Sequence, residues 1–311
     1  MSALVNGQNS QPEILSIIQS TNNYETRNWD TELAFRYVLA FGHAIVEASL
    51  FRHYSQGRHI KDVLELPTSY GCPVGCIHCA SGELIATRPL TTGQITVMAD
   101  LMAAKTGLSY EHPFLVTFSG IGEGALRRKV IEGAVSLLYS RFVNVRFTLT
   151  TVGFDSSYIA FVDYLAASYP VHWLQVSWLH HDPEVLSRLV PTSFGRRFDS
   201  ESLLTAISAC EKVRVRLNYV VMTGINDSRN DIDAFLDCIR RHSFAGTVRV
   251  SRYNTTTPGD RAGLRPPTMG TLSMIVDRIR DVGHDAYAFA SHRDDRLNCG
   301  QLAYDYRAPG K

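Results

Sequence analysis

The most informative stretch of the chain is residues 71–79, Gly71-Cys72-Pro73-Val74-Gly75-Cys76-Ile77-His78-Cys79. Its three thiols are separated by three and then by two residues, so they can bind three irons of one cubic cluster. A 4Fe-4S cluster ordinarily takes four cysteine thiolates, and the next cysteine in the sequence is Cys210. The spacing therefore predicts a cluster with one iron left open.

A zinc site is the alternative interpretation of three neighbouring cysteines. Zinc would need a fourth ligand, and His78 and Cys299 are the candidates. His78 stands between two of the cysteines, which is a sterically awkward position for a ligand of the same ion. We therefore favour iron–sulfur ligation by Cys72, Cys76 and Cys79.

Predicted strands and helices alternate along most of the chain. Runs rich in β-branched or aromatic residues lie at 63–68, 114–119, 145–151, 172–178, 213–222, 248–253 and 286–290, and helix-like stretches at 92–104, 125–140, 156–167, 199–211, 229–241 and 268–282. This alternation predicts right-handed βαβ units, a parallel sheet and functional residues at the carboxyl ends of the strands. The fold class is therefore α/β.

The N-terminal part has a different pattern. Residues 35–40 and 44–51 are apolar and β-prone with Gly42 between them, which predicts a hairpin. A short helix is predicted at residues 12–19. We expect an N-terminal segment at residues 1–60 and a main domain at residues 61–311.

Composition narrows the functional classes. The chain has 31 Lys and Arg against 30 Asp and Glu, so it lacks the global cationic field that drives binding to a polyanion. The first twenty residues do not resemble a secretion signal, and no window approaches the roughly 20 apolar residues of a membrane span. We expect a cytoplasmic protein with reduced cysteines and no membrane partner.

The spacing of Cys72, Cys76 and Cys79 resembles the CxxxCxxC loop of the radical S-adenosylmethionine (SAM) superfamily. The resemblance implies a partial (β/α)6 barrel, a 4Fe-4S cluster and SAM bound through its amino and carboxylate groups to the open iron. It also implies SAM cleavage to a 5′-deoxyadenosyl radical, with a reductant such as flavodoxin or ferredoxin as partner. His78 departs from the family pattern, which usually has an aromatic residue there.

Several strand ends resemble the adenine-methylating RlmN/Cfr branch of this superfamily. Residues 118–123, Phe-Ser-Gly-Ile-Gly-Glu, are similar to the branch's Gly-Met-Gly-Glu-Pro segment, and residues 148–153 resemble its Ser-Thr-Ser-Gly segment. At residue 179 a leucine replaces the branch's histidine, which appears one position later as His180. The resemblance implies that SAM is contacted by Gly122, Glu123, Thr150, Ser177 and Asn254.

The most specific resemblance is near the C-terminus. Residues 298–302, Asn-Cys-Gly-Gln-Leu, are similar to the branch's Ala-Cys-Gly-Gln-Leu, whose cysteine is methylated and carries the methylene group to the substrate. This implies a catalytic role for Cys299, which we expect on a loop. Glu47 is similar to the branch's Ile-Glu-Thr glutamate, which is assigned as a proton acceptor, although a glutamate in a hairpin is most often a solvated residue.

Two departures affect the predicted reaction. The branch has a resolving cysteine seven residues before the first cluster cysteine, and this chain has Glu65 there. The branch also has a long helical RNA-recognition domain before the hairpin, where this chain has about thirty residues. The neutral charge and the short N-terminal part favour a small-molecule or nucleoside-like substrate over RNA.

Three hypotheses follow from these residues. The first is a radical SAM enzyme acting on a small molecule, with Cys299 as methyl carrier or hydrogen-atom donor. The second is an RlmN/Cfr-like methyl synthase acting on adenine in RNA. The third is a non-catalytic iron–sulfur protein.

Overall fold

The computed structural model of the protein describes residues 11–23, 29–84, 87–108, 113–153, 155–191, 200–290, 297 and 300–307. Its strands are β1 (Glu13–Asn23), β2 (Thr31–Phe41), β3 (Ala44–Ser55), β4 (Arg58–Leu66), β5 (Phe114–Phe118), β6 (Val145–Thr151), β7 (Val171–Trp178), β8 (Arg214–Val221), β9 (Thr247–Arg252) and β10 (Ala286–Phe289). All ten form one sheet in the order of the sequence. The first four are mutually antiparallel, whereas β4 to β10 are parallel.

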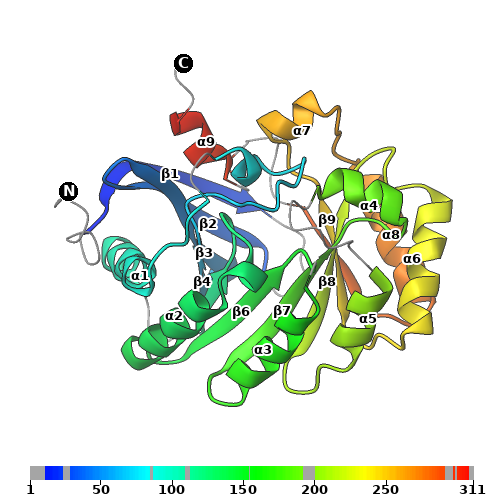
Figure 1. Cartoon of the computed structure of the whole chain (residues 1–311), viewed down its shortest axis with the longest axis horizontal. Helices are drawn as coiled ribbons and strands as arrows, with labels where there is room; N and C mark the ends of the chain where they lie inside the picture. The colour runs from blue at the N-terminus through cyan, green and yellow to red at the C-terminus, as the bar shows by residue number, and fades with distance from the viewer. Residues whose placement is uncertain are drawn as a thin grey trace.

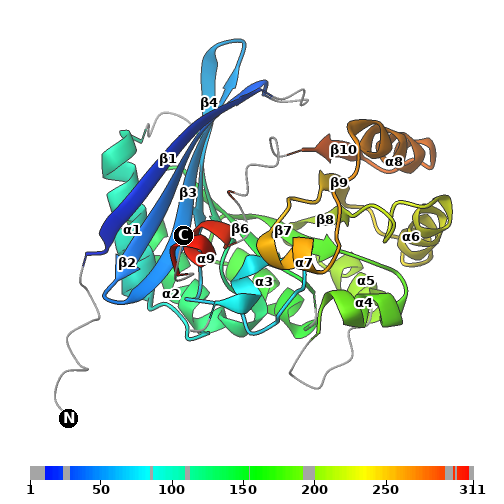
Figure 2. The ribbon, with the colours of Figure 1, turned by 90° about the horizontal axis from the view of Figure 1, so that it is seen from above.

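The helices are α1 (Thr92–Thr106), α2 (Arg128–Arg141), α3 (Ser157–Ala166), α4 (Pro183–Leu189), α5 (Ser200–Ser208), α6 (Arg229–Arg241), α7 (Thr257–Arg261), α8 (Met269–Asp281) and α9 (Gln301–Arg307), with short 3-10 helices η1 (Ala80–Glu83) and η2 (Gly124–Leu126). Helices α1, α2, α3, α5, α6 and α8 follow the outer side of the curved sheet (Figure 1, Figure 2). In contrast, α7, α9 and the loop after β4 lie together at the carboxyl ends of the parallel strands (Figure 1).

The two faces of the sheet differ: the outer face is apolar and the inner face is partly exposed. On β7, Leu174, Val176 and Trp178 are buried, whereas the residues between them are partly exposed. Successive side chains of a strand point to opposite faces, so the buried set lies under the helices. The hydrophobic core therefore fills the layer between sheet and helices and leaves the inner face free for other contacts.

These observations confirm the α/β class, the partial barrel and the hairpin, which is β2 and β3 around Gly42. The predicted helix at residues 12–19 is wrong, because Glu13–Asn23 forms β1 and pairs with β2 along its length. The predicted boundary between residues 60 and 61 falls inside β4 and stays a prediction. None of the helices in the described ranges is long and apolar enough to cross a membrane.

Candidate active site

The cysteine loop, residues 71–79, follows β4 and is held by backbone hydrogen bonds. The Cys72 N–H donates to the Ser81 carbonyl (2.9 Å) and the Cys79 N–H to the Cys76 carbonyl (3.1 Å). The Ile77 N–H donates to the carbonyl of Leu189, the last residue of α4 (3.0 Å). The loop is thus folded back on itself and attached to the other side of the barrel mouth.

The three thiols lie where a cation would stabilise their thiolate forms. Burial and the neighbouring Cys79 raise the pKa of Cys72 to about 12. Burial is also the main cause that raises the pKa of Cys76 and of Cys79. Without a cation these cysteines stay protonated, whereas cysteines bind metals as thiolates.

The spread of the thiols fits a cluster better than a single ion. Among the described residues, the only group of three or more potential ligand atoms lying within 4.8 Å of one another is that of His180, His181 and Asp231. The three sulfurs of the cysteine loop do not form such a group. Thiolates on one tetrahedral zinc, at about 2.3 Å from the ion, would be roughly 3.8 Å apart.

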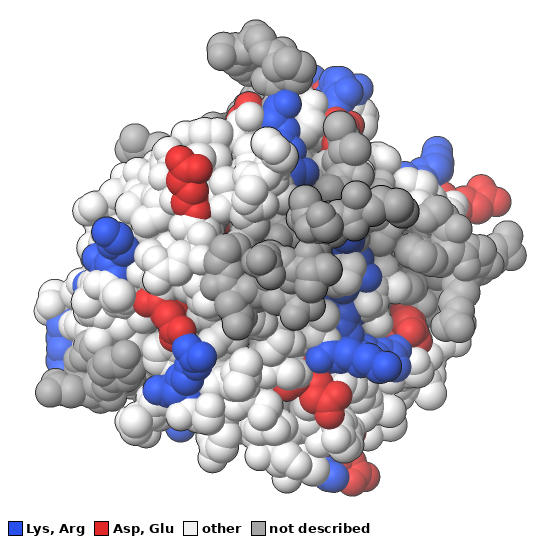
Figure 3. Space-filling view, turned by 60° about the vertical axis from the view of Figure 1, so that its left-hand side comes forward, with Lys and Arg blue, Asp and Glu red and all other residues white. Residues whose placement is uncertain are grey.

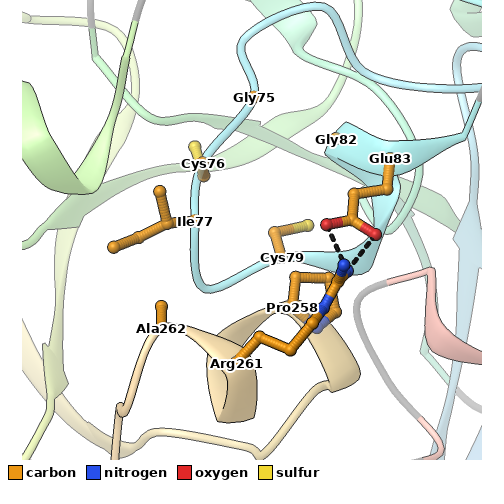
Figure 4. Close-up of a pocket in the computed structure, with 9 residues that line it drawn as sticks. All are labelled: Gly75, Cys76, Ile77, Cys79, Gly82, Glu83, Pro258, Arg261 and Ala262. Atoms are coloured by element: carbon orange, nitrogen blue, oxygen red, sulfur yellow. Dashed lines mark hydrogen bonds and ion pairs between the residues drawn. The ribbon is translucent and has the colours of Figure 1, made fainter.

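A pocket of about 340 Å³ lies between the cysteine loop, η1 and α7. Cys76 and Cys79 are on its wall, and Arg261 extends from α7 to an ion pair with Glu83 (Figure 4). The N-cap residue of α7, Thr256, donates through its hydroxyl to the carbonyl of residue 78 in the loop (3.1 Å). Helix α7 therefore attaches the end of β9 to the cysteine loop.

Glu123 follows β5 and is buried close to the cysteine loop. Its carboxylate accepts hydrogen bonds from the Ala125 N–H (3.0 Å), the Val152 N–H (2.9 Å) and the Thr151 hydroxyl. Burial nevertheless raises its pKa. Its charge also contributes to the raised pKa of the thiol of Cys72. Glu123 thus adds negative charge near the thiols. A bound cation would stabilise the carboxylate of Glu123 and the thiolates of the cysteine loop.

Gly122 allows a close approach of two loops. Its φ is +117°, and a Cβ atom there would lie 2.3 Å from Thr68 Oγ1 and 3.1 Å from Ser69 Oγ. Only glycine fits such a backbone without displacing its neighbours. The residue therefore holds the end of β5 against the chain that leads into the cysteine loop.

The remaining predicted SAM contacts lie at the carboxyl ends of other strands. Thr150 and Ser177 are near the ends of β6 and β7, and Asn254 is two residues after β9. All three are partly exposed. The Thr150 hydroxyl donates to the Phe118 carbonyl (2.6 Å), which joins β6 to β5. Their contacts with SAM stay predictions.

Glu47 lies on β3 and is 8% exposed, so it is not a solvated hairpin residue. Its carboxylate accepts hydrogen bonds from the backbone N–H groups of Gly300 (2.6 Å) and Ala303 (3.2 Å) at the start of α9. Cys299 is outside the described residues. Its neighbour Gly300 is held between Glu47 and η1, since a Cβ at Gly300 would lie 2.3 Å from Ser81 Oγ.

Some features of this region were not predicted. Helix α9 and its attachment to Glu47 had no sequence signal beyond the Cys-Gly-Gln-Leu similarity. His180 is buried; its Nδ1 accepts from the Asp182 N–H (2.9 Å), and its Nε2 lies 3.4 Å from Asp231 Oδ1. The imidazole ring is therefore held by its own loop and by Asp231 of α6. The histidine that stands one position later than in the RlmN/Cfr branch thus has partners within this fold.

A known family model covers the middle of the chain. Residues 66–238, more than half of the chain, match the model described as the radical SAM superfamily. The chain belongs to the radical SAM superfamily. Membership indicates an enzyme, so the hypothesis of a non-catalytic iron–sulfur protein is not supported. It also implies a 4Fe-4S cluster and SAM as cofactors.

Two curated relatives of this radical SAM protein are named as RNA methyltransferases. The chain is 30% identical to a probable dual-specificity RNA methyltransferase RlmN of Thermus thermophilus, over 78% of this chain and 68% of that protein. It is 26% identical to the probable protein of that name from Deinococcus deserti, over 76% and 68% respectively. The resemblance to the RlmN/Cfr branch is thus confirmed.

A solved structure supports the same fold. A radical SAM methyltransferase from Sphaerobacter thermophilus superposes with a TM-score of 0.69, covering 92% of this chain and 80% of that chain at 22% identity. At this identity the similarity concerns the fold. Because the match leaves only 8% of this chain uncovered, most of the N-terminal strands belong to the shared architecture.

Proposed function

We propose that this radical SAM enzyme modifies a small molecule and that Cys299 takes part in the reaction, as methyl carrier or as hydrogen-atom donor. The observation that carries the proposal is the position of Gly300, which contacts Glu47 on one side and Ser81 on the other. Ser81 is two residues after the cluster ligand Cys79, and Gly300 is the direct chain neighbour of Cys299. The backbone at position 300 thus supports a place for this thiol near the cluster.

The residues of the site support distinct roles. The cluster would be held by Cys72, Cys76 and Cys79. Glu123 would accept a charge-assisted hydrogen bond from the SAM ammonium group. When bound, the cluster and SAM supply a 5′-deoxyadenosyl radical by reductive cleavage of SAM, with the electron coming from a reductant such as flavodoxin or ferredoxin. Neighbouring strand ends would line the SAM site through Gly122, Thr150, Ser177 and Asn254.

A thiol at position 299 would act in one of two ways. As a thiolate it would attack the SAM methyl group, giving S-methylcysteine and S-adenosylhomocysteine. As a thiol it would give its hydrogen atom to a carbon radical, and the resulting thiyl radical would take one electron from the reductant and one proton from solvent. Glu65 occupies the position of the resolving cysteine, so the disulfide step of the RlmN/Cfr branch has no counterpart at that position.

RNA as substrate is the second candidate, and the names of the curated relatives favour it. The nearly balanced charge of the chain, with 31 Lys and Arg against 30 Asp and Glu, does not favour it. Among the residues that the structure describes, the face in Figure 3 carries Lys and Arg in separate groups, with Asp and Glu beside several of them. Binding to a polyanion is strengthened by a continuous basic surface.

The test uses SAM with a deuterated methyl group and, separately, deuterated solvent without substrate. A methyl carrier predicts that the peptide containing Cys299 gains a trideuteriomethyl group. A hydrogen-atom donor predicts that solvent deuterium, carried by the exchangeable thiol, enters 5′-deoxyadenosine. The solvent deuterium in 5′-deoxyadenosine should be lost in Cys299→Ala and retained in the control Cys238→Ala. If neither label depends on Cys299, the cysteine has no role in the reaction.

A further inference from the structure

The inner face of the sheet carries two arginines that form no ion pair with a carboxylate of the described residues. Arg216 lies on β8 and Arg249 on the adjacent β9. Because Asn218 pairs with Arg249 and Arg216 pairs with Thr247, the two arginines are diagonal neighbours. Both are partly exposed, so they border the open side of the sheet.

The contacts of Arg249 are with neutral groups. Its Nε donates to Asn218 Oδ1 (2.9 Å), and its guanidinium carbon lies 4.5 Å from the centre of the Phe289 ring. These contacts position the side chain through Nε and through one face of the guanidinium group. The terminal amino groups keep donor capacity for a ligand.

Arg216 is held in a similar way. Its Nη1 donates to the Tyr287 hydroxyl (2.9 Å), and its guanidinium carbon lies 4.9 Å from the centre of the Trp173 ring. Its Nε is buried without a hydrogen-bond partner. A buried donor that lacks an acceptor costs free energy, so the protein's own groups satisfy the guanidinium of Arg216 only in part.

Cations on this face repel one another. Burial and Arg216 lower the pKa of Lys61 to about 8. Burial and Arg216 also lower the pKa of Arg249 to about 10. The three groups therefore lie close enough for each to disfavour the charge of another, and a bound anion would relieve this repulsion.

The nearby carboxylates compensate this charge only in part. Glu32 is engaged by Asn22 Nδ2 (3.0 Å) and His53 Nε2 (3.0 Å). Glu65 is attracted by Arg249 and by Arg36, yet burial is the largest effect and raises its pKa. Glu65 therefore attracts Arg249 without forming an ion pair with it, and Glu32 is held by other partners.

Building on the proposed function, we propose that Arg216 and Arg249 bind a phosphate group of the substrate on the inner face of the barrel. Guanidinium groups match phosphate oxygens in bidentate geometry. The rings of Trp173, Tyr287 and Phe289 lie on the same face and provide an apolar wall for the rest of the molecule. The substrate class is thus a phosphorylated small molecule with a planar or apolar portion.

The test measures binding to the anaerobic, cluster-containing protein with SAM bound and without reductant, so that it does not depend on SAM cleavage. Probes are AMP, adenosine and inorganic phosphate. We expect AMP to bind at least tenfold more tightly than adenosine and to be displaced by inorganic phosphate. Arg216→Gln and Arg249→Gln should each weaken AMP binding at least tenfold, with SAM affinity and iron content unchanged.

The control is Arg240→Gln, an exposed arginine on α6, which should bind AMP as the wild type does. Arg216→Lys keeps the charge and should retain part of the AMP affinity that Arg216→Gln loses, which distinguishes a lost phosphate contact from a general loss of folding. Equal affinities for AMP and adenosine, or equal effects of Arg240→Gln and Arg216→Gln, would overturn the phosphate site.

Two further outcomes separate this site from its alternatives. A short single-stranded RNA that binds tenfold more tightly than AMP, and loses this advantage in Arg216→Gln, would assign the phosphate to a polynucleotide and overturn the small-molecule source. Failure of SAM cleavage by the reduced protein would contradict the proposed function, whereas the binding result would stand without it.

Discussion

The Glu47 carboxylate on β3 accepts a hydrogen bond from the Gly300 backbone N–H at 2.6 Å, across 253 residues of sequence. The contact joins the N-terminal strands to the C-terminal helix α9. Because Gly300 also packs against Ser81, a single backbone position connects β3 with η1, directly after the cysteine loop. The N-terminal strands therefore support the candidate active site and are not only a flank of the barrel.

Glu47 should make stability depend on pH. Burial raises its pKa from 4.5 to about 7, although the N–H groups of Gly300 and Ala303 act in the opposite direction. The folded protein thus keeps a proton that the unfolded chain has lost, and wild type should lose stability relative to Glu47→Gln as pH rises from 4.5 to about 7. The full change is about 3 kcal/mol, at about 1.4 kcal/mol per pKa unit.

Urea unfolding across this pH range measures the effect. The exposed Glu211 gives the control variant Glu211→Gln, whose curve of stability against pH should run parallel to that of the wild type. Parallel curves for wild type and Glu47→Gln would show that Glu47 titrates alike in the folded and unfolded states.

Gly300→Ala should lower the folding stability more than the same change at Gly42, another glycine with a left-handed backbone conformation. Gly300 has φ +83° and a Cβ there would lie 2.3 Å from Ser81 Oγ, whereas Gly42 has φ +63° and no atom within 4 Å of the added Cβ. Gly42→Ala should cost about 1 kcal/mol of folding free energy from backbone strain alone. Gly300→Ala should cost more and also lower the iron content, because Ser81 must move. Equal losses of stability and iron in both variants would contradict the close packing.

Glu123→Gln should weaken SAM binding and leave the iron content unchanged. The carboxylate is buried and its pKa is raised by that burial, so a bound ammonium group would stabilise its charge. Loss of a charge-assisted hydrogen bond corresponds to roughly 1.5–3 kcal/mol, or about ten- to hundredfold in affinity. Equilibrium binding measures this, with the exposed Glu184→Gln on α4 as control. An unaltered SAM affinity would remove Glu123 from the site.

Most of the sheet could be predicted because parallel strands under helices have strong local patterns. The strand at residues 145–151 and the helix at residues 229–241 were predicted with the bounds that the structure gives them. Strand β1 was missed because Ile14, Ile17 and Ile18 have a spacing that also suits one face of a helix. Pairing with β2, a tertiary contact, decides between the two.

In the candidate site, too, local sequence patterns predict some features and tertiary contacts decide the others. Cys72, Cys76 and Cys79 are close in sequence, so their spacing predicts their chemistry. The burial of Glu47 and the juxtaposition of arginines on β8 and β9 depend on contacts between distant segments, which no local pattern of a single sequence encodes.

SAM cleavage by the anaerobically reconstituted protein with a strong reductant tests the radical SAM chemistry most directly. Wild type should bind about four irons per chain and form 5′-deoxyadenosine and methionine in equal amounts. Cys76→Ala should lose both the cluster and the products, whereas Cys210→Ala should keep both, because Cys210 lies after α5 and bonds to Asp163. Absence of 5′-deoxyadenosine from four-iron wild type, or cleavage by Cys76→Ala at the wild-type rate, would contradict this chemistry.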